Sequence, residues 1–271
     1  MNNYEVEGIG TIVYHEYGEG EQYLFAFHGY GMNGKQFQNL PSYLLSKYKV
    51  IGINLFFHEG SEIKPYSLAK IQQGLAKKDI IKLIAPLLAK HEIQDFAIAG
   101  YSIGSNFALT LMEYYADRIK QIYLFAPDGI EPNAFLRNIS SNRFGNYLFY
   151  QIAYHQSLLP FILKLSNQIR FLNDELYGIA IAEVDTIDKR KAVYNCMTYQ
   201  KNIVPDMVIV ESNIRKYEIP VVMVYGKKDG LFPLQTGAHF LVDYPHKTTY
   251  NLDFGHFMII PALDEALTKQ A

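Results

Sequence analysis

The sequence has no tryptophan and only one cysteine, Cys196, among its 271 residues. One cysteine cannot form an internal disulfide or a CxxC metal site, so a disulfide framework of the secreted kind and a cysteine-rich metal centre are both excluded. Cys196 lies in a helical pattern without the local signatures of a thiol nucleophile. We therefore interpret it as a buried structural residue.

The chain also lacks an excess of either charge and a long apolar run. It has 25 Lys and Arg against 27 Asp and Glu, mixed along the sequence, which gives no electrostatic basis for binding nucleic acid or an anionic membrane. The apolar stretch 157–165 is far too short to span a bilayer and contains a lysine. Residues 1–5 do not resemble the basic start of a signal peptide, so we expect a cytoplasmic protein with no membrane span.

Hydrophobic residues make up 49% of the chain, enough to bury a large core. Several apolar runs rich in β-branched and aromatic residues predict strands buried on both faces, at 23–27, 49–54, 96–99, 121–126 and 221–225. Residues 4–9 and 11–16 alternate around Gly10 and predict an edge hairpin. Helical patterns over 68–88 and 103–119 lie between the runs. This alternation predicts an α/β fold with a mostly parallel sheet flanked by helices.

From residue 130 to 214 the strand signal gives way to a helical pattern crowded with aromatic residues. We therefore predict a core of residues 1–129 and 215–271 with a helical insertion, 130–214, placed over the sheet. Most of the insertion's aromatic side chains are expected to pack in its own core. They are Phe135, Phe144, Tyr147, Phe149, Tyr150, Tyr154, Phe161 and Phe171.

The strongest local motif is Gly100-Tyr101-Ser102-Ile103-Gly104, between the predicted strand 96–99 and a predicted helix. In this context a G-x-S-x-G sequence predicts a nucleophile elbow, a strained turn that projects the serine hydroxyl from the end of the sheet. The small flanking glycines suit a place where helix and strand come close. The alternative is an ordinary strand-to-helix turn with Ser102 as helix N-cap.

A nucleophilic serine needs a base, and two residues after later strands can provide it. Asp229 follows the run 221–225, and His256 follows the last predicted strand. The order Ser, Asp, His is that of an elbow-type triad, with His256 as general base and Asp229 orienting it. A turn aspartate and a surface histidine are the alternatives. Asp128, at the end of another strand, is a second candidate for the triad acid.

The segment His28-Gly29-Tyr30-Gly31 directly follows the strand 23–27. An oxyanion hole needs backbone N–H groups aimed at the reacting carbonyl oxygen, and we predict those of Tyr30 and Ile103. His28 is interpreted as a structural turn residue. The remaining histidines lack ligand spacing such as HExxH, so we predict no metal and no cofactor.

Together these motifs resemble the α/β-hydrolase superfamily over nearly the whole chain. The resemblance implies an eight-stranded, mostly parallel α/β-hydrolase sheet with a helical cap inserted after strand six. It also implies hydrolysis without metal or cofactor. A serine in the elbow disfavours the superfamily's dehalogenases and epoxide hydrolases, which use aspartate there. The sequence departs from the common pattern at Asn54, where relatives often have aspartate, and at Ser105, where many have glycine.

The resulting hypothesis is a carboxylesterase-like serine hydrolase acting on a small, largely apolar ester through an acyl-enzyme. A thioesterase or a carbon–carbon bond hydrolase could use the same triad. The latter is disfavoured because Phe257 follows His256, where carbon–carbon hydrolases often have tryptophan. An alternative from another class is a ligand-binding, receptor-like protein on a hydrolase fold with negligible turnover. The oligomeric state is not predicted.

Overall fold

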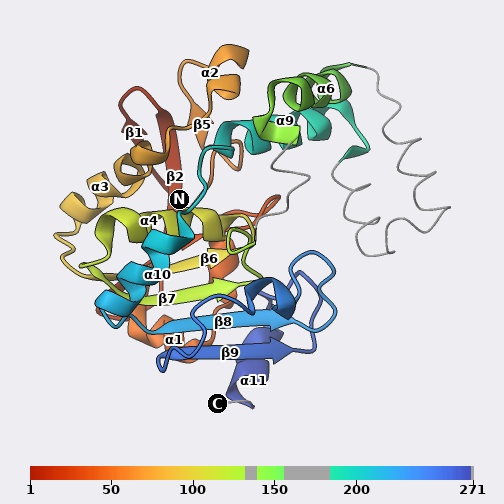
Figure 1. Ribbon diagram of the computed structural model, residues 1–271. Helices are drawn as coiled ribbons and strands as arrows, with labels where there is room; N and C mark the ends of the chain where they lie inside the picture. The colour runs from red at the N-terminus through yellow and green to blue at the C-terminus, as the bar shows by residue number, and fades with distance from the viewer. Residues whose placement is uncertain (132–138, 156–183, 270–271) are drawn as a thin grey trace. The chain divides into compact units, whose positions relative to one another are not determined.

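The computed structural model describes residues 1–131, 139–155 and 184–269 (Figure 1). Within these residues nine strands form one sheet, in the order β1-β2-β4-β3-β6-β7-β8-β9, with the short β5 pairing with β2. The strands are β1 (Asn2–Val6), β2 (Gly10–Tyr17), β3 (Gln22–Phe27), β4 (Tyr48–Ile53), β5 (Glu62–Ile63), β6 (Phe96–Tyr101), β7 (Ile119–Phe125), β8 (Val221–Gly226) and β9 (Lys247–Leu252).

The sheet is parallel from β4 through β3, β6, β7 and β8 to β9, and antiparallel only where β2 meets β1, β4 and β5. The predicted mostly parallel α/β fold is therefore confirmed. The expected hairpin around Gly10 is also present, with Val6 opposite Gly10. Eight strands follow one path, as expected, and β5 adds a ninth at the side. The carboxyl ends of the parallel strands share one edge, which is where open α/β sheets collect functional residues.

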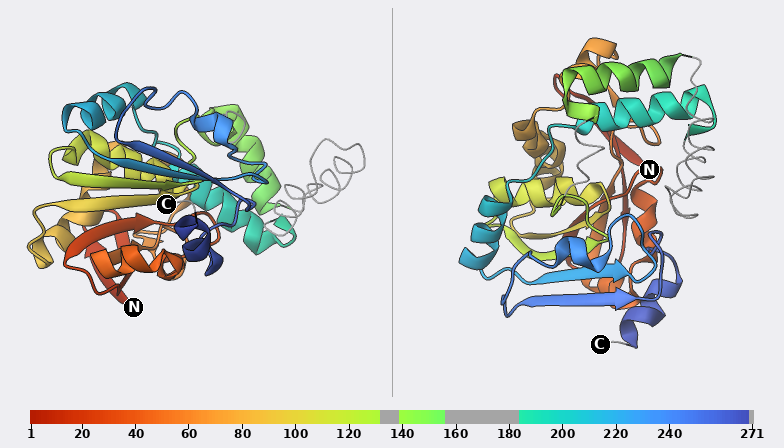
Figure 2. Two further views of the ribbon diagram at one scale, coloured as in Figure 1. Left: turned by 90° about the horizontal axis from the view of Figure 1, so that it is seen from below. Right: turned by 45° about the vertical axis from the view of Figure 1, so that its right-hand side comes forward.

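Helices cover both faces of this sheet (Figure 1, Figure 2). On one face lie α3 (Ile80–Lys90), α4 (Gly104–Tyr115) and α10 (Met207–Lys216), and on the other lie α1 (Ser42–Lys47) and α11 (Ala262–Thr268). The core on the α1 and α11 side joins residues far apart in sequence, including Leu24, Leu44, Tyr48 and Leu263. Strands covered on both faces explain why the central runs are apolar throughout instead of alternating.

Two helix predictions were wrong in extent. The pattern over 68–88 is interrupted, because α2 (Leu68–Gln73) ends at Gly74, whose φ of 81° is not helical, and α3 begins only at Ile80. The pattern over 103–119 also ends early, at Tyr115. Ile119 already belongs to β7, where it pairs with Phe96 of β6, so sheet pairing overrides the apolar periodicity there.

Contacts between residues divide the chain into two compact units. The first contains the sheet and comprises Met1–Pro65, Ala76–Glu131 and Ile203–Ala271, and the second comprises Tyr66–Leu75 and Pro132–Asn202. The predicted boundaries of the cap, 130 and 214, stay a prediction. Within the described residues no helix is both long and apolar enough to cross a membrane.

The second unit contains α2, α6 (Arg143–Tyr154) and α9 (Ile187–Gln200). Several of its aromatic side chains pack on one another: the ring of Tyr194 contacts those of Phe149, Tyr150 and Tyr154. These contacts agree with the prediction that the aromatic residues form a core of their own. Phe144 and Tyr147 are instead exposed. The predicted residues Phe135, Phe161 and Phe171, and the apolar stretch 157–165, lie outside the described residues.

Candidate active site

Ser102 lies in a strained turn between β6 and α4. Its φ of 52° is in the left-handed region that non-glycine residues rarely adopt. A Cβ atom on Gly104 would come within 2.1 Å of the Phe27 carbonyl oxygen, and one on Gly100 within 2.5 Å of the Cα of Ser105. Helix α4 can therefore approach the strands only with glycine at both positions. The elbow geometry expected from the motif is present.

Ser102, His256 and Asp229 form one chain of hydrogen bonds. His256 Nε2 lies 3.0 Å from Ser102 Oγ, and His256 Nδ1 lies 2.9 Å from Asp229 Oδ2. Because an ionised carboxylate only accepts, Nδ1 carries the proton and Nε2 accepts from the serine hydroxyl. The three residues are 154 and 27 positions apart in sequence, and β6, β8 and β9 bring them to one edge of the sheet.

Both oxygens of the Asp229 carboxylate accept hydrogen bonds. Its side chain is 0% exposed, and Oδ1 accepts from the backbone N–H groups of Leu231 and Phe232 at 2.8 and 3.0 Å. Burial raises the pKa of Asp229, but the hydrogen bond and charge of His256 and the two backbone N–H groups outweigh it and lower the pKa overall. The carboxylate is therefore ionised at neutral pH. The carboxylate paired with His256 Nδ1 is Asp229, whereas Asp128 donates its backbone N–H to the Ser102 carbonyl.

The His-Gly turn passes directly beside the elbow. Gly29 approaches Ser102 so closely that a Cβ atom at residue 29 would be 3.3 Å from the serine Cβ. The turn is closed by a hydrogen bond from the Met32 N–H to the Gly29 carbonyl, with Tyr30 inside it. In the described part of the chain the Ile103 N–H meets no protein acceptor. The oxyanion hole built from Tyr30 and Ile103 stays a prediction that this placement allows.

Two buried histidines hold this turn through backbone groups. His28 Nδ1 donates to the Gly29 carbonyl at 2.7 Å, and its Nε2 accepts from Leu55 N–H at 2.9 Å. His58 Nε2 accepts from Gly31 N–H at 3.1 Å. Both ring nitrogens of His28 are occupied by backbone partners, which fits a structural residue and not a base.

Sequence reasoning did not find Tyr101, the residue before the serine. Its hydroxyl donates to the backbone carbonyl of His256 at 2.8 Å, and its ring stacks on the imidazole with centroids 5.3 Å apart. Phe232 places a second ring 5.7 Å from the same imidazole. Its place directly before Ser102, at the first of the two x positions of the G-x-S-x-G motif, is a local signal that could have singled it out.

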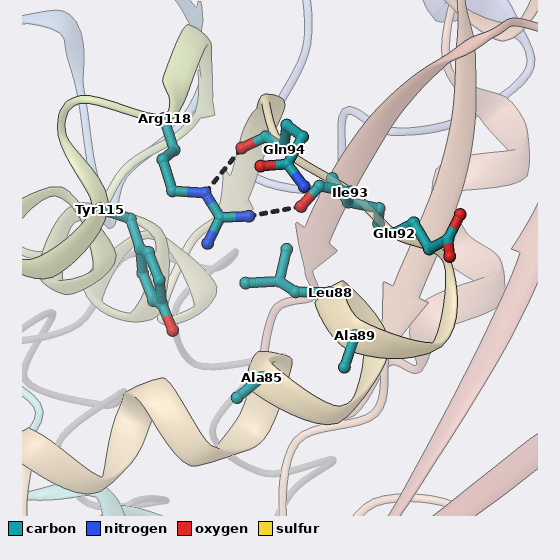
Figure 3. Close-up of a pocket in the computed structure, with 8 residues that line it drawn as sticks. All are labelled: Ala85, Leu88, Ala89, Glu92, Ile93, Gln94, Tyr115 and Arg118. Carbon is teal, nitrogen blue, oxygen red and sulfur yellow. Dashed lines mark hydrogen bonds between the residues drawn. The ribbon is translucent and has the colours of Figure 1, made fainter.

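A hollow of about 730 Å³ lies elsewhere in the sheet-containing unit (Figure 3). It is lined by Ala85, Leu88, Ala89, Glu92, Ile93, Gln94, Tyr115 and Arg118. Several of these residues precede β6 and β7, so the hollow is at the amino edge of the sheet, opposite Ser102. Arg118 donates to the backbone carbonyls of Ile93 and Gln94, as Figure 3 shows. These hydrogen bonds give the guanidinium a structural role.

Among the described residues no group of three or more His, Cys, Asp or Glu side chains is arranged to hold a metal ion. Cys196 is buried, and its burial raises the pKa of the thiol far above the usual range. A reactive thiolate at this position is therefore not favoured.

Comparison with known proteins matches the chain to one protein family and to named hydrolases. Residues 24–262 match the family described as alpha/beta hydrolase fold. The chain is 20% identical to the "Uncharacterized hydrolase YugF" of Bacillus subtilis (strain 168) over 266 residues, 95% of this chain and 92% of that protein. It is 24% identical to the pimeloyl-[acyl-carrier protein] methyl ester esterase of Aliivibrio salmonicida (strain LFI1238) over 265 residues, 93% of this chain and 91% of the relative.

Among solved structures, a thermophilic esterase from Thermogutta terrifontis is similar in fold. The TM-score is 0.64 at 12% sequence identity, and the match covers 99% of this chain and 95% of the esterase. At this identity the likeness shows a common fold.

Proposed function

Since residues 24–262 place the chain in the alpha/beta hydrolase fold family, we propose that this hydrolase cleaves a carboxylic ester, or a related acyl bond, with Ser102 as its nucleophile. His256 acts as general base and Asp229 orients it. The observation that carries the proposal is a continuous chain of hydrogen bonds. Ser102 Oγ lies 3.0 Å from His256 Nε2, and His256 Nδ1 lies 2.9 Å from the buried carboxylate of Asp229. A binding protein has no need of such a chain.

The reaction proceeds in two acyl transfers. Ser102 Oγ attacks the carbonyl carbon while His256 Nε2 takes the hydroxyl proton, and the resulting imidazolium is stabilised by the Asp229 carboxylate. Collapse of the tetrahedral intermediate breaks the bond to the leaving alkoxide, which receives the proton from His256. Water then attacks the acyl-enzyme with His256 as base. Collapse of the second tetrahedral intermediate breaks the bond from the acyl carbon to Ser102 Oγ, which regains its proton from His256 as the acid leaves.

The developing oxyanion is stabilised by the backbone N–H groups of Tyr30 and Ile103. Ile103 lies at the start of α4, so its N–H and the helix dipole both favour negative charge at this point. The close passage of Gly29 beside Ser102 supports its neighbour Tyr30 as the second donor.

The relative named as a methyl ester esterase, which is 24% identical over 93% of this chain, supports an ester as the bond. An apolar substrate is suggested by the aromatic residues of 130–214, so we propose small esters with an apolar acyl or alcohol part. Thioesters, carbon–carbon bonds and binding without turnover are the other outcomes that the experiment distinguishes.

The first experiment is intact-protein mass spectrometry after exposure to a fluorophosphonate probe, with p-nitrophenyl ester turnover measured in parallel. Ser102→Ala should abolish both the adduct and turnover. Ser105→Ala is the matched control, because this buried serine lies three residues further along the chain, in α4, and should keep both. Labelling without ester turnover would favour a thioester or carbon–carbon substrate, or a receptor. A folded wild-type protein that does not label would overturn the proposal.

A second experiment identifies the triad acid. Asp229→Asn should lower kcat by about 10⁴-fold, since the amide stabilises the wrong tautomer of the histidine. Asp128→Asn serves as the control and should change kcat less than tenfold. A large loss in Asp128→Asn with little change in Asp229→Asn would reverse the assignment.

A further inference from the structure

We propose that Tyr101 is a positioning residue, which holds His256 in register with Ser102. The inference rests on the proposed function, because it concerns the residue that this function uses as its base. Tyr101 is 1% exposed and immediately precedes the serine. It takes no part in the proposed acyl-transfer steps.

The hydroxyl of Tyr101 fixes the backbone of the histidine. It donates to the His256 carbonyl oxygen at 2.8 Å, across 155 positions in sequence. His256 lies four residues beyond the end of β9, in a segment without regular secondary structure. Such a segment depends on individual hydrogen bonds for its position. The hydrogen bond from Tyr101 joins this segment directly to the elbow. Because Tyr101 is also peptide-bonded to Ser102, one residue links the base to the nucleophile.

The ring of Tyr101 fixes the orientation of the imidazole. The two rings stack with an interplanar angle of 29° and centroids 5.3 Å apart. A tyrosine face attracts positive charge, so the same contact favours the imidazolium that forms as His256 takes the serine proton. Phe232, whose ring is tilted by 46° at 5.7 Å, adds a second aromatic contact.

The same ring also meets the His-Gly turn. A Cβ atom on Gly29 would lie 2.7 Å from the Tyr101 ring, so the turn can pack this closely against the ring only with glycine at position 29. Tyr101 therefore contacts the histidine segment and the turn that contains Tyr30, while its backbone continues into Ser102. One buried residue therefore contacts or adjoins the elbow, the His256 segment and the His-Gly turn, which together make up the proposed reaction centre.

The test compares Tyr101→Phe with a matched control, Tyr244→Phe. Phenylalanine at 101 keeps the ring and removes only the hydroxyl. Tyr244 is also a buried tyrosine, and its hydroxyl proton is shared between the carbonyl oxygens of Ile219 and Ile214 at 3.0 and 3.2 Å. It lies next to the start of β8, at the edge of the sheet away from Ser102. The two variants lose comparable hydrogen bonds in places that differ in distance from the reaction centre.

For each variant kcat and KM on a p-nitrophenyl ester, the rate constant of Ser102 phosphonylation and the midpoint of thermal unfolding are measured. We expect Tyr101→Phe to lower kcat and the phosphonylation rate by about tenfold, with KM changed less than twofold, because misplacement of a reacting group affects the chemical step. Tyr101→Leu, which also removes the ring, should lower kcat further. Tyr244→Phe should lower the thermal midpoint and leave kcat within twofold.

Wild-type kcat in Tyr101→Phe would overturn the inference, as would an equal loss of kcat in both tyrosine variants, which would indicate a general effect of stability. If Tyr101→Leu does not fold, Tyr101→Phe decides alone. Failure of the proposed function gives a different result: the wild-type protein itself then shows no adduct on Ser102, and the inference falls with it.

Discussion

Lowering the pH from 7 to 5 is expected to destabilise the protein through His28. This side chain is 0% exposed, and both of its ring nitrogens are engaged, with the Gly29 carbonyl and with the Leu55 N–H. Burial, and then the neighbouring His58, lower the pKa of His28 from 6.5 to about 3. A second proton on the ring would also face the Leu55 N–H, donor against donor.

The direction follows from proton linkage. The pKa of His28 is lower in the folded protein than in the unfolded chain, so the unfolded chain binds the additional proton as the pH falls below 6.5. Stability is therefore lost between pH 6.5 and about 3. At roughly 1.4 kcal/mol per pH unit over the 1.5 units from 6.5 to 5, His28 contributes a loss of about 2 kcal/mol. For a chain of this size, that corresponds to about 4–8 °C in the unfolding midpoint.

Other groups do not reverse this trend. The pKa values of His58 and His15 are also lowered, chiefly by burial, so they add to the loss in the same direction. The pKa of Asp229 is lowered below its usual 3.8, so its contribution is lost only at pH values near and below 3.8, outside the interval from pH 7 to 5.

The assay is urea denaturation at pH 7, 6 and 5 for the wild-type protein and two variants. His28→Gln should be less stable at pH 7, because it loses backbone hydrogen bonds, but its stability should fall by about 2 kcal/mol less between pH 7 and 5. His239→Gln, at an exposed position, is the control and should keep the wild-type pH dependence. An unchanged pH dependence in His28→Gln would refute the reasoning.

Two further predictions concern buried polar groups. Asn54 is 0% exposed; its Oδ1 accepts from Gly34 N–H and its Nδ2 donates to the Glu59 carbonyl, so Asn54→Asp replaces a donor by a buried negative oxygen. Urea denaturation at pH 7 should show a loss of about 1–3 kcal/mol, and unchanged stability would contradict it. Cys196, buried and with a raised thiol pKa, should react with iodoacetamide only after unfolding. Mass spectrometry of native and urea-treated samples checks this, and rapid labelling of the native protein would disprove it.

The sheet could be predicted because its central strands are covered on both faces. Such strands appear in the sequence as short continuous apolar runs, as at 96–99 and 221–225, and these runs correspond to β6 and β8. The ends of the helices were harder to predict. The apolar spacing continues across Gly74 and across Ile119, although the first ends a helix and the second pairs with Phe96 in the sheet. Periodicity records which residues are apolar, and not which neighbour they pack against.

The candidate site, like the fold, was predictable from the sequence only in part. The sequence alone determined the residue types and their order, because an elbow needs small residues around Ser102 and because Asp229 and His256 each follow a strand. It favoured Asp229 and left Asp128 as the alternative acid, since both stand after strands of the same sheet. The pairing of His256 with Asp229 comes from the adjacent parallel strands β8 and β9, whose loops lie side by side. The contact of Tyr101 with His256 likewise exists only after folding, because stacking and a hydrogen bond across 155 residues have no trace in local sequence.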